Sequence, residues 1–177
     1  MTRLTEQSWL DHGLRVLAKS GYTNLKAATM AQDLGVSRGS FYWHFRDIRE
    51  FKRRLLNHWQ QQTTDEIIAQ MQSQDRDSQR LAELMFRAYS SNPHLDRAVR
   101  FWGNHDAQVQ KHLTKVDRLR LAYIRDLLLD SGIDAEEAAT RARLIYAASL
   151  GDAAIAPKAA RPLSKLDLQY LASVLSQ

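Results

Sequence analysis

Cysteine is absent from the 177 residues of this chain, and glycine and proline are scarce, with seven and three residues. Without cysteine there can be no disulfide bond and no thiolate metal site, which is compatible with a reducing compartment. No apolar run approaches ~18 residues, the length that a membrane-spanning helix needs. The first residues also lack the apolar stretch of a signal peptide. We therefore expect a soluble, cytoplasmic protein that does not enter a membrane.

The alternation of apolar and polar residues that is typical of strands is almost missing. Apolar residues recur instead at spacings of three and four, which is the pattern of amphipathic helices. Side chains that can cap helices stand at Thr5, at Asp47 with Glu50, and at Asp134 with Glu137. The sequence thus predicts an all-α fold, with polar or proline-marked breaks at 73–78, 92–93 and 157–162 and with helices over 5–20, 48–70, 79–90, 107–130, 163–175 and from 134 onward.

The net positive charge of the chain comes from its first third. Residues 1–60 contain ten basic and five acidic side chains, which accounts for the whole net charge of +5, while residues 61–177 balance. A local positive field attracts phosphates and makes binding depend on salt. On its own, the same composition also describes an ordinary solvated basic surface.

Residues 31–45, with the sequence AQDLGVSRGSFYWHF, have the pattern of a helix-turn-helix. Gly35 stands where a first short helix ends and the backbone often needs a positive φ, which glycine adopts without steric cost. Ser37 can cap the second helix with its hydroxyl. Phe41 and Phe45 point inward, so the other side chains of this second helix face outward.

The outward side chains suit contact with DNA. Arg38 can donate two hydrogen bonds to a guanine, and Ser40 can bond to a base edge. Tyr42 and His44 have the reach of phosphate contacts, which set the register of a protein on DNA. Gly39 has no side chain and lets the backbone approach DNA closely.

Residues 1 to about 60 resemble the DNA-binding domain of the TetR family of bacterial transcriptional regulators. The resemblance rests on the helix end at 19–22, on Met30-Ala31, on the turn at 34–37 and on the run Phe41-Tyr42-Trp43-His44-Phe45 followed by Arg46-Asp47. It implies a three-helix head that binds DNA, followed by a helical body that binds an effector and dimerises.

Two departures from the family pattern occur around the second helix. Family members usually open this helix with Thr or Ser, which caps it and touches phosphate, whereas this chain has Leu25 and Lys26. Asn24 or Lys26 then substitutes. Ala28 stands where some members have an arginine that reads a base, so we expect specificity mainly from residues 38–44.

A third departure is Ile48, which stands where many members place a phosphate-binding lysine. Arg46 or Arg49 is expected to compensate. Trp43 has two interpretations, because its ring can touch a sugar or a thymine methyl or can pack against the next helix. The predicted DNA-binding set is Lys26, Ser37, Arg38, Gly39, Ser40, Tyr42, Trp43, His44 and Arg46.

The domain organisation follows from the motif. We expect a DNA-binding domain over 1–47, linked through a helix over 48–72, and an effector-binding and dimerisation domain over 48–177. One short recognition helix reads few base pairs, so two copies about 34 Å apart are needed for useful specificity. The last two helices are rich in alanine and leucine and can form a four-helix bundle with those of a second subunit; a monomer whose last helix only closes the core is the alternative.

Sequence patterns in residues 48–177 indicate function less clearly. Amide and polar-tipped aromatic side chains near the expected inner faces can line a mostly apolar effector pocket, although each can equally be an ordinary core or surface residue. His105 and His112 are two helical turns apart, roughly 10 Å, too far to share a metal ion. No cofactor is expected, and no motif of phosphate-binding loops, serine hydrolases or zinc proteases is present. The candidate effector-binding residues are Trp102, Asn104, His105, Tyr123 and Tyr146.

The sequence therefore predicts a non-enzymatic, homodimeric regulator that binds an inverted-repeat operator in double-stranded DNA and is released from it by a small-molecule effector. Two alternatives remain. The first is a DNA-binding activator or architectural protein without an effector. The second is a small-molecule binding protein whose DNA-binding head is vestigial.

Overall fold

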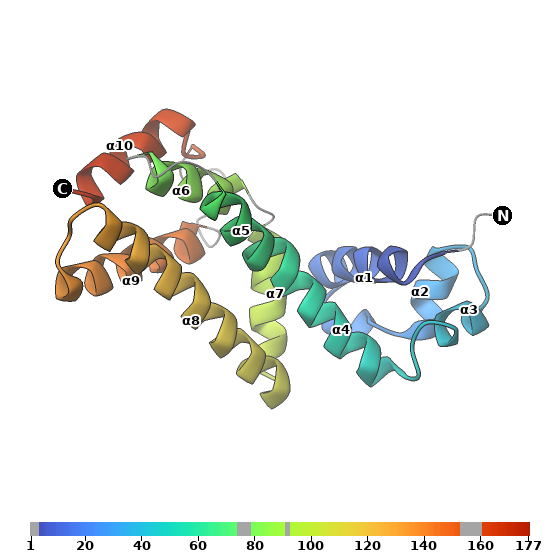
Figure 1. The fold of residues 1–177 in the computed structure, drawn as a ribbon. Helices are drawn as coiled ribbons and strands as arrows, with labels where there is room; N and C mark the ends of the chain where they lie inside the picture. Colours follow the sequence, from blue (N-terminus) through green and yellow to red (C-terminus); the bar gives the residue numbers. More distant parts are fainter. Residues whose placement is uncertain (1–3, 74–78, 91–92, 153–160) are drawn as a thin grey trace. The chain divides into compact units, whose positions relative to one another are not determined.

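The computed structural model describes residues 4–73, 79–90, 93–152 and 161–177, and every regular element among them is helical (Figure 1). The all-α prediction is therefore confirmed. In chain order the elements are α1 (Glu6–Ser20), η1 (Tyr22–Asn24), α2 (Ala27–Asp33), α3 (Arg38–Tyr42), α4 (Ile48–Gln60), η2 (Gln61–Asp65), α5 (Glu66–Gln72), α6 (Arg80–Ser90), α7 (Pro93–Gly103), α8 (Ala107–Asp130), α9 (Ala135–Asp152) and α10 (Lys165–Leu175).

The chain packs as two compact units that do not follow chain order. The first unit comprises residues 1–62 and 94–113, and the second comprises 63–93 and 114–177. The first unit thus contains α1 to α4, α7 and the beginning of α8. The division by function that we expect at residues 47 and 48 remains a prediction, because compactness alone does not assign function.

The first unit is built around a buried aromatic core. Thr5 caps α1, its hydroxyl accepting a hydrogen bond from the Ser8 N–H at 3.1 Å. α1 then buries Trp9 against Phe41 of α3, with ring centroids 5.4 Å apart in an edge-to-face arrangement. Gly13 of α1 faces Phe51 of α4 so closely that a Cβ there would lie 2.6 Å from the ring atom Cζ. Glycine therefore lets α1 and α4 approach each other.

The second unit has a separate aliphatic core. α6, α8, α9 and α10 contribute buried side chains to it, including Leu128, Ala138 and Leu168, which are at most 1% exposed. α10 begins with a capping box in which Ser164 accepts from the Asp167 N–H and Asp167 accepts from the Ser164 N–H. Sequence reasoning placed the start of this helix at residue 163 and missed the box.

Two expected helices differ in detail. The helix predicted over 48–70 is interrupted, because Gln61–Asp65 form a π-helical turn between α4 and α5, at the point where the chain passes from the first unit to the second. α8 has the predicted bounds, 107–130. The predicted loop at 73–78, Asn92 and Pro157 lie wholly or largely outside the described residues.

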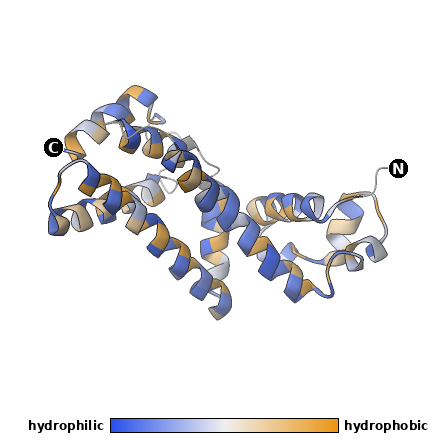
Figure 2. Ribbon diagram, viewed as in Figure 1, coloured by the Kyte–Doolittle hydropathy of each residue, from blue (hydrophilic) through white to orange (hydrophobic). Residues whose placement is uncertain are grey.

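Hydrophobic and hydrophilic residues are mixed along the helices, as amphipathic packing requires (Figure 2). Among the described residues no helix is both long and apolar enough to cross a membrane.

Candidate nucleic-acid interface

α2 and α3 form the helix-turn-helix expected from the sequence. Gly35 lies between them with a φ of +65°, the left-handed conformation that glycine adopts without a steric penalty. The turn is closed by backbone bonds from the Gly35 N–H to Gln32 O at 3.1 Å and from the Val36 N–H to Ala31 O at 3.0 Å. This tight, hydrogen-bonded turn therefore sets the direction of α3 relative to α2.

The inner side of α3 is anchored in aromatic packing. Phe41, Phe45 and Phe51 are at most 1% exposed, and their ring centroids lie 4.9 to 5.4 Å from one another. Such offset and edge-to-face contacts add to the free energy of apolar burial. This packing fixes the orientation of a helix of only five residues.

The outer side of α3 presents the side chains expected at DNA. Arg38 and Gly39 are exposed, Tyr42 is 49% exposed, and Trp43, just after the helix, is 77% exposed. Packing of Trp43 into the next helix is therefore wrong, and the ring lies at the surface. The Arg38 guanidinium carbon lies 5.8 Å from the centroid of the Tyr42 ring, within the range of a cation–π contact.

Two residues of the predicted set behave differently from expectation. Ser37 occupies the N-cap position of α3, but its side chain makes no capping hydrogen bond; the expected cap is wrong. His44 is half-buried, and its Nε2 donates to the backbone carbonyl of Leu4 at 2.9 Å. That nitrogen ties the segment before α1 to the residues just after α3, so it is not available to a phosphate in this structure.

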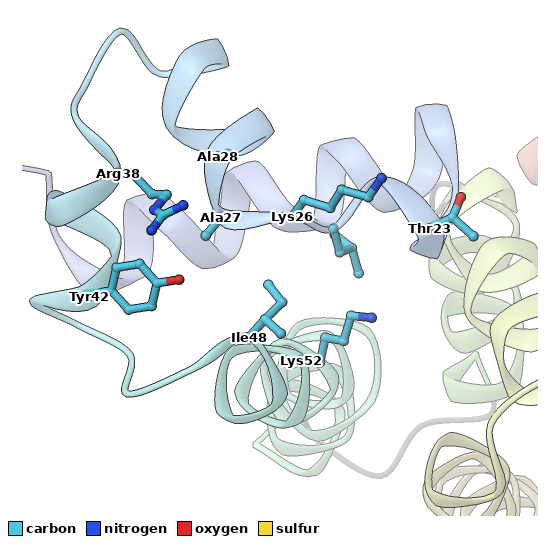
Figure 3. Close-up of a pocket in the computed structure, with 9 residues that line it drawn as sticks. Thr23, Lys26, Ala27, Ala28, Arg38, Tyr42, Ile48 and Lys52 are labelled. Atoms are coloured by element: carbon cyan, nitrogen blue, oxygen red, sulfur yellow. The ribbon is translucent and has the colours of Figure 1, made fainter.

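A hollow of about 390 Å³ opens between α2, α3 and α4 (Figure 3). In Figure 3, Arg38 and Tyr42 lie at one end of it, while the ammonium groups of Lys26 and Lys52 extend toward the Thr23 end. None of the lining residues is acidic. They are Thr23, Leu25, Lys26, Ala27, Ala28, Arg38, Tyr42, Ile48 and Lys52.

The cations that line this hollow differ from the set expected from the sequence. Arg46, expected to compensate for Ile48, does not line the hollow; its Nε lies 3.4 Å from the Asp47 carboxylate. Lys52 does line it, one turn of α4 after Ile48. Sequence reasoning missed Lys52 and Thr23, although the spacing of four on one helix face was a usable signal for the lysine.

The carboxylates nearest the start of α4 are engaged elsewhere. Asp47 caps the helix by accepting from the Glu50 N–H at 2.7 Å. In a capping box the Glu50 side chain would accept in return from the Asp47 N–H. It accepts instead from the N–H of the preceding residue, Arg46, at 2.8 Å. The bond from the Arg46 N–H, together with Arg54, holds the pKa of Glu50 below its ordinary value. Arg54 also reaches Glu6 at 2.8 Å.

Three of the candidate effector residues lie in the first unit. Trp102 is 2% exposed and stacks on Tyr22, with centroids 6.0 Å apart and ring planes at 4°. His105 also stacks on Tyr22, at 5.9 Å, and its Nδ1 donates to the Phe101 carbonyl. Asn104 is exposed. The rings of Trp102 and His105 thus belong to an aromatic cluster with Tyr22 of η1.

The other two candidates lie in the second unit. Tyr146 is 8% exposed, donates to Asp117 Oδ1 at 2.7 Å and accepts from Arg120 at 3.4 Å. Arg120 also donates to the hydroxyls of Thr64 at 2.9 Å and Thr63 at 3.0 Å, in the π-helical turn. The Tyr123 hydroxyl accepts from Arg80 at 3.4 Å. Tyr146 is therefore part of a half-buried polar network that reaches the π-helical turn.

His105 and His112 do not share a helix, because His105 precedes α8. Within the described ranges no group of three or more His, Asp or Glu side chains is arranged to hold a metal ion.

Comparisons with known proteins agree with this geometry. Residues 10–54 match the family model described as bacterial regulatory proteins, tetR family. The match runs from Leu10, inside α1, through α2 and α3 to the first half of α4. No curated protein matches the sequence. The matched segment contains the whole helix-turn-helix and every residue that lines the hollow.

Solved structures resemble the chain over nearly its whole length. A transcriptional regulator from Saccharomonospora viridis in complex with choline has a TM-score of 0.73 at 16% identity, covering 96% of this chain and 93% of that one. A transcriptional regulator from Rhodococcus sp. Rha1 has a TM-score of 0.73 at 20% identity, covering 98% and 94%. The regulator FadR from Bacillus subtilis in complex with stearoyl-CoA has a TM-score of 0.68 at 14% identity, covering 97% and 96%. Residues 10–54 thus match the tetR family of bacterial regulatory proteins, and the chain as a whole has the fold of the solved transcriptional regulators.

Proposed function

We propose that this protein is a homodimeric, sequence-specific repressor that leaves its operator when a small-molecule effector binds. The observation that supports DNA recognition most directly is the outer side of α3, where Arg38, Tyr42 and Trp43 are exposed over a rigid aromatic core. Arg38 and Tyr42 also line a hollow whose charged lining residues are all cationic.

Each exposed group has a separate role in this proposal. Arg38 reads a guanine in the major groove through its two-pronged guanidinium, which gives about 1–3 kcal/mol of discrimination against other bases. Gly39 lets the helix backbone approach, and Ser40 contacts a base edge. Tyr42 and Lys26 bind backbone phosphates, which fix register without reading sequence.

Four further residues have narrower roles. Trp43 contacts a sugar or a thymine methyl with its exposed ring. Arg46 and the Ser37 hydroxyl add phosphate contacts at the two ends of α3. His44 supports the helix through its bond to Leu4, rather than contacting DNA with Nε2.

Dimerisation is supported by the outer faces of α9 and α10. α10 buries Leu168 and Ala172 but exposes Leu166, Tyr170 and Val174, at a spacing of four, to 76%, 69% and 49%. Leu144 of α9 is 59% exposed. Large apolar side chains aligned in this way are typical of helices that pack against a second subunit.

An effector is supported by two structural relatives, which were solved with choline and with stearoyl-CoA. We place the effector in the second unit of this chain, with Tyr146 and Tyr123 as polar contacts, because their hydroxyls already meet arginines there. Trp102 and His105 instead support the head through Tyr22. The effector then favours a dimer geometry whose two recognition helices no longer match the half-site spacing.

The test is selection of bound sequences from random duplex DNA, using the wild-type protein and the double variant Arg38→Ala, Tyr42→Ala. Lys19→Ala is the matched control, because Lys19 is an exposed cation of α1 that does not line the hollow. We expect an inverted repeat for the wild type and the control but not for the double variant. Arg38→Ala alone should weaken operator binding about 5- to 150-fold for each half-site, and a dimer on an inverted repeat loses this base contact twice.

Two other outcomes of the selection would favour the alternative functions. Weak enrichment without a two-fold repeat would favour an architectural protein, and an unchanged selection by the double variant would favour a vestigial head. Once an operator is known, reporter repression in cells separates a repressor from an activator. Sedimentation of the protein on operator DNA tests the dimer.

A further inference from the structure

The far end of the hollow, away from α3, contains a cation besides Lys26, namely Lys52, to which the proposed function gives no role. Lys26 at the N-cap of α2 and Lys52 of α4 extend toward this end, beside the hydroxyl-bearing Thr23 (Figure 3). The remaining lining between the two ends is apolar, from Leu25, Ala27, Ala28 and Ile48. The hollow thus has one cationic end at α3 and a second at Lys26 and Lys52.

Lys52 differs from an ordinary surface lysine because its position is fixed by aromatic packing. Its ammonium nitrogen lies 5.6 Å from the centroid of the Trp102 ring, within the distance of a cation–π interaction. Trp102 is itself 2% exposed and stacked flat on Tyr22. A lysine held in this way loses less conformational freedom when it binds an anion.

The charge balance around Lys52 also favours an anion. No lining residue of the hollow is acidic, and the nearby carboxylates of α4 are bonded to the backbone and to Arg54. Both cationic ends line one hollow of the first unit, so a polyanion bound at Arg38 and Tyr42 would have the second end beside it.

We propose that Lys52, positioned by Trp102, binds a backbone phosphate of DNA at the Thr23 end of the hollow, and that Trp102 is a positioning residue for this contact. This inference rests on the proposed DNA-binding function. It assigns α7, through Trp102, a part in forming the DNA-binding surface. A phosphate contact is independent of sequence, so its loss weakens operator and non-operator DNA alike.

The experiment measures the affinity of full-length Lys52→Gln for operator and for unrelated duplex DNA by fluorescence anisotropy at several salt concentrations. The proposed homodimer carries two copies of Lys52, so the variant loses two phosphate contacts per bound dimer and the slope of log affinity against log salt falls by about 1.8. The ratio of wild-type to variant affinity should therefore shrink about twelvefold between 50 and 200 mM salt. Lys19→Gln, which removes the same charge from an exposed site of α1 outside the hollow, should leave the slope unchanged.

Two further variants separate positioning from folding. Lys52→Arg keeps the charge and the ring contact, so it should restore the wild-type slope. Trp102→Leu should weaken DNA binding in the wild-type background but have much less effect in the Lys52→Gln background, because residues that act through one another are not additive. Additive effects of the two substitutions would reject the positioning role of Trp102.

The proposal for Lys52 is wrong if Lys52→Gln has the same salt slope as the wild type and Lys19→Gln, while Arg38→Ala still weakens operator binding. Failure of the DNA-binding function itself would look different, because neither Arg38→Ala nor Lys52→Gln would then alter any affinity.

Discussion

Replacing Gly13 by alanine should destabilise the protein, although alanine is the better helix former. Gly13 lies inside α1, where the change to alanine alone contributes about 1 kcal/mol of stability. The added Cβ, however, would lie 2.6 Å from Phe51 Cζ and 3.0 Å from Leu55 Cδ1. Both neighbours are fully buried, so neither can turn away into solvent. Overpacking of a core costs about 1–3 kcal/mol, so a net loss of up to about 2 kcal/mol is expected.

The same substitution should also weaken DNA binding. The rings of Phe51 and Phe41 are in contact, with centroids 5.4 Å apart. Phe41 is the one residue of α3 whose side chain is buried. A shift of the Phe51 ring therefore displaces the anchor of the recognition helix. We expect the loss of operator affinity to exceed what the change in folded population alone explains.

Urea denaturation followed by far-UV circular dichroism measures the loss of stability, with Gly151→Ala as the matched control. Gly151 lies in the last turn of α9, and a Cβ built there meets no neighbour outside its own turn within 4 Å. Its replacement should be neutral or stabilise by up to about 0.5–1 kcal/mol, the value for the middle of a helix. If Gly13→Ala proved as stabilising as Gly151→Ala, the close approach of α1 and α4 would not constrain the head, and this reasoning would be refuted.

Three further predictions concern other parts of the molecule. The pKa of Glu50 is lowered in the folded state, so the ionised carboxylate stabilises the fold. This contribution is complete above the unfolded pKa near 4.5 and disappears as the pH falls through the folded value. Glu50→Gln should therefore reduce the loss of melting temperature that the wild type shows at acid pH. Gly39→Ala should leave the melting temperature unchanged or higher, since its Cβ meets only Ser37 Oγ at 3.6 Å, but should weaken operator binding in a gel-shift assay; equal binding would exclude a close backbone approach. Tyr170→Glu should shift the dimer toward monomer in analytical ultracentrifugation without unfolding it, and an unchanged dimer would place the interface elsewhere.

Local sequence patterns were sufficient to predict most of the helices and the turn between α2 and α3. The spacing of apolar residues in 107–130 reproduced α8, because a long amphipathic helix depends on residues close in sequence. The cap at Thr5 was predictable for the same reason. The inward positions of Phe41 and Phe45 followed from the helical period.

Contacts between distant segments could not be predicted from those patterns. The bond from His44 to Leu4 joins residues 40 apart, and the local pattern showed only an outward polar ring. Trp102 resembled a pocket residue, but it stacks on Tyr22 and faces Lys52. Ser37 stands at the expected cap position, yet side-chain rotation decides whether a cap forms, and the sequence does not specify it.

The distribution of the four tryptophans has a practical consequence. Trp9, Trp59 and Trp102 are at most 2% exposed, whereas Trp43 is 77% exposed and lies just after the recognition helix. A water-soluble collisional quencher such as acrylamide will therefore act mainly on Trp43. The unlabelled protein thus has an intrinsic fluorescent reporter at its proposed DNA surface, so that occupancy of that surface can be followed by loss of quenching without attaching a dye.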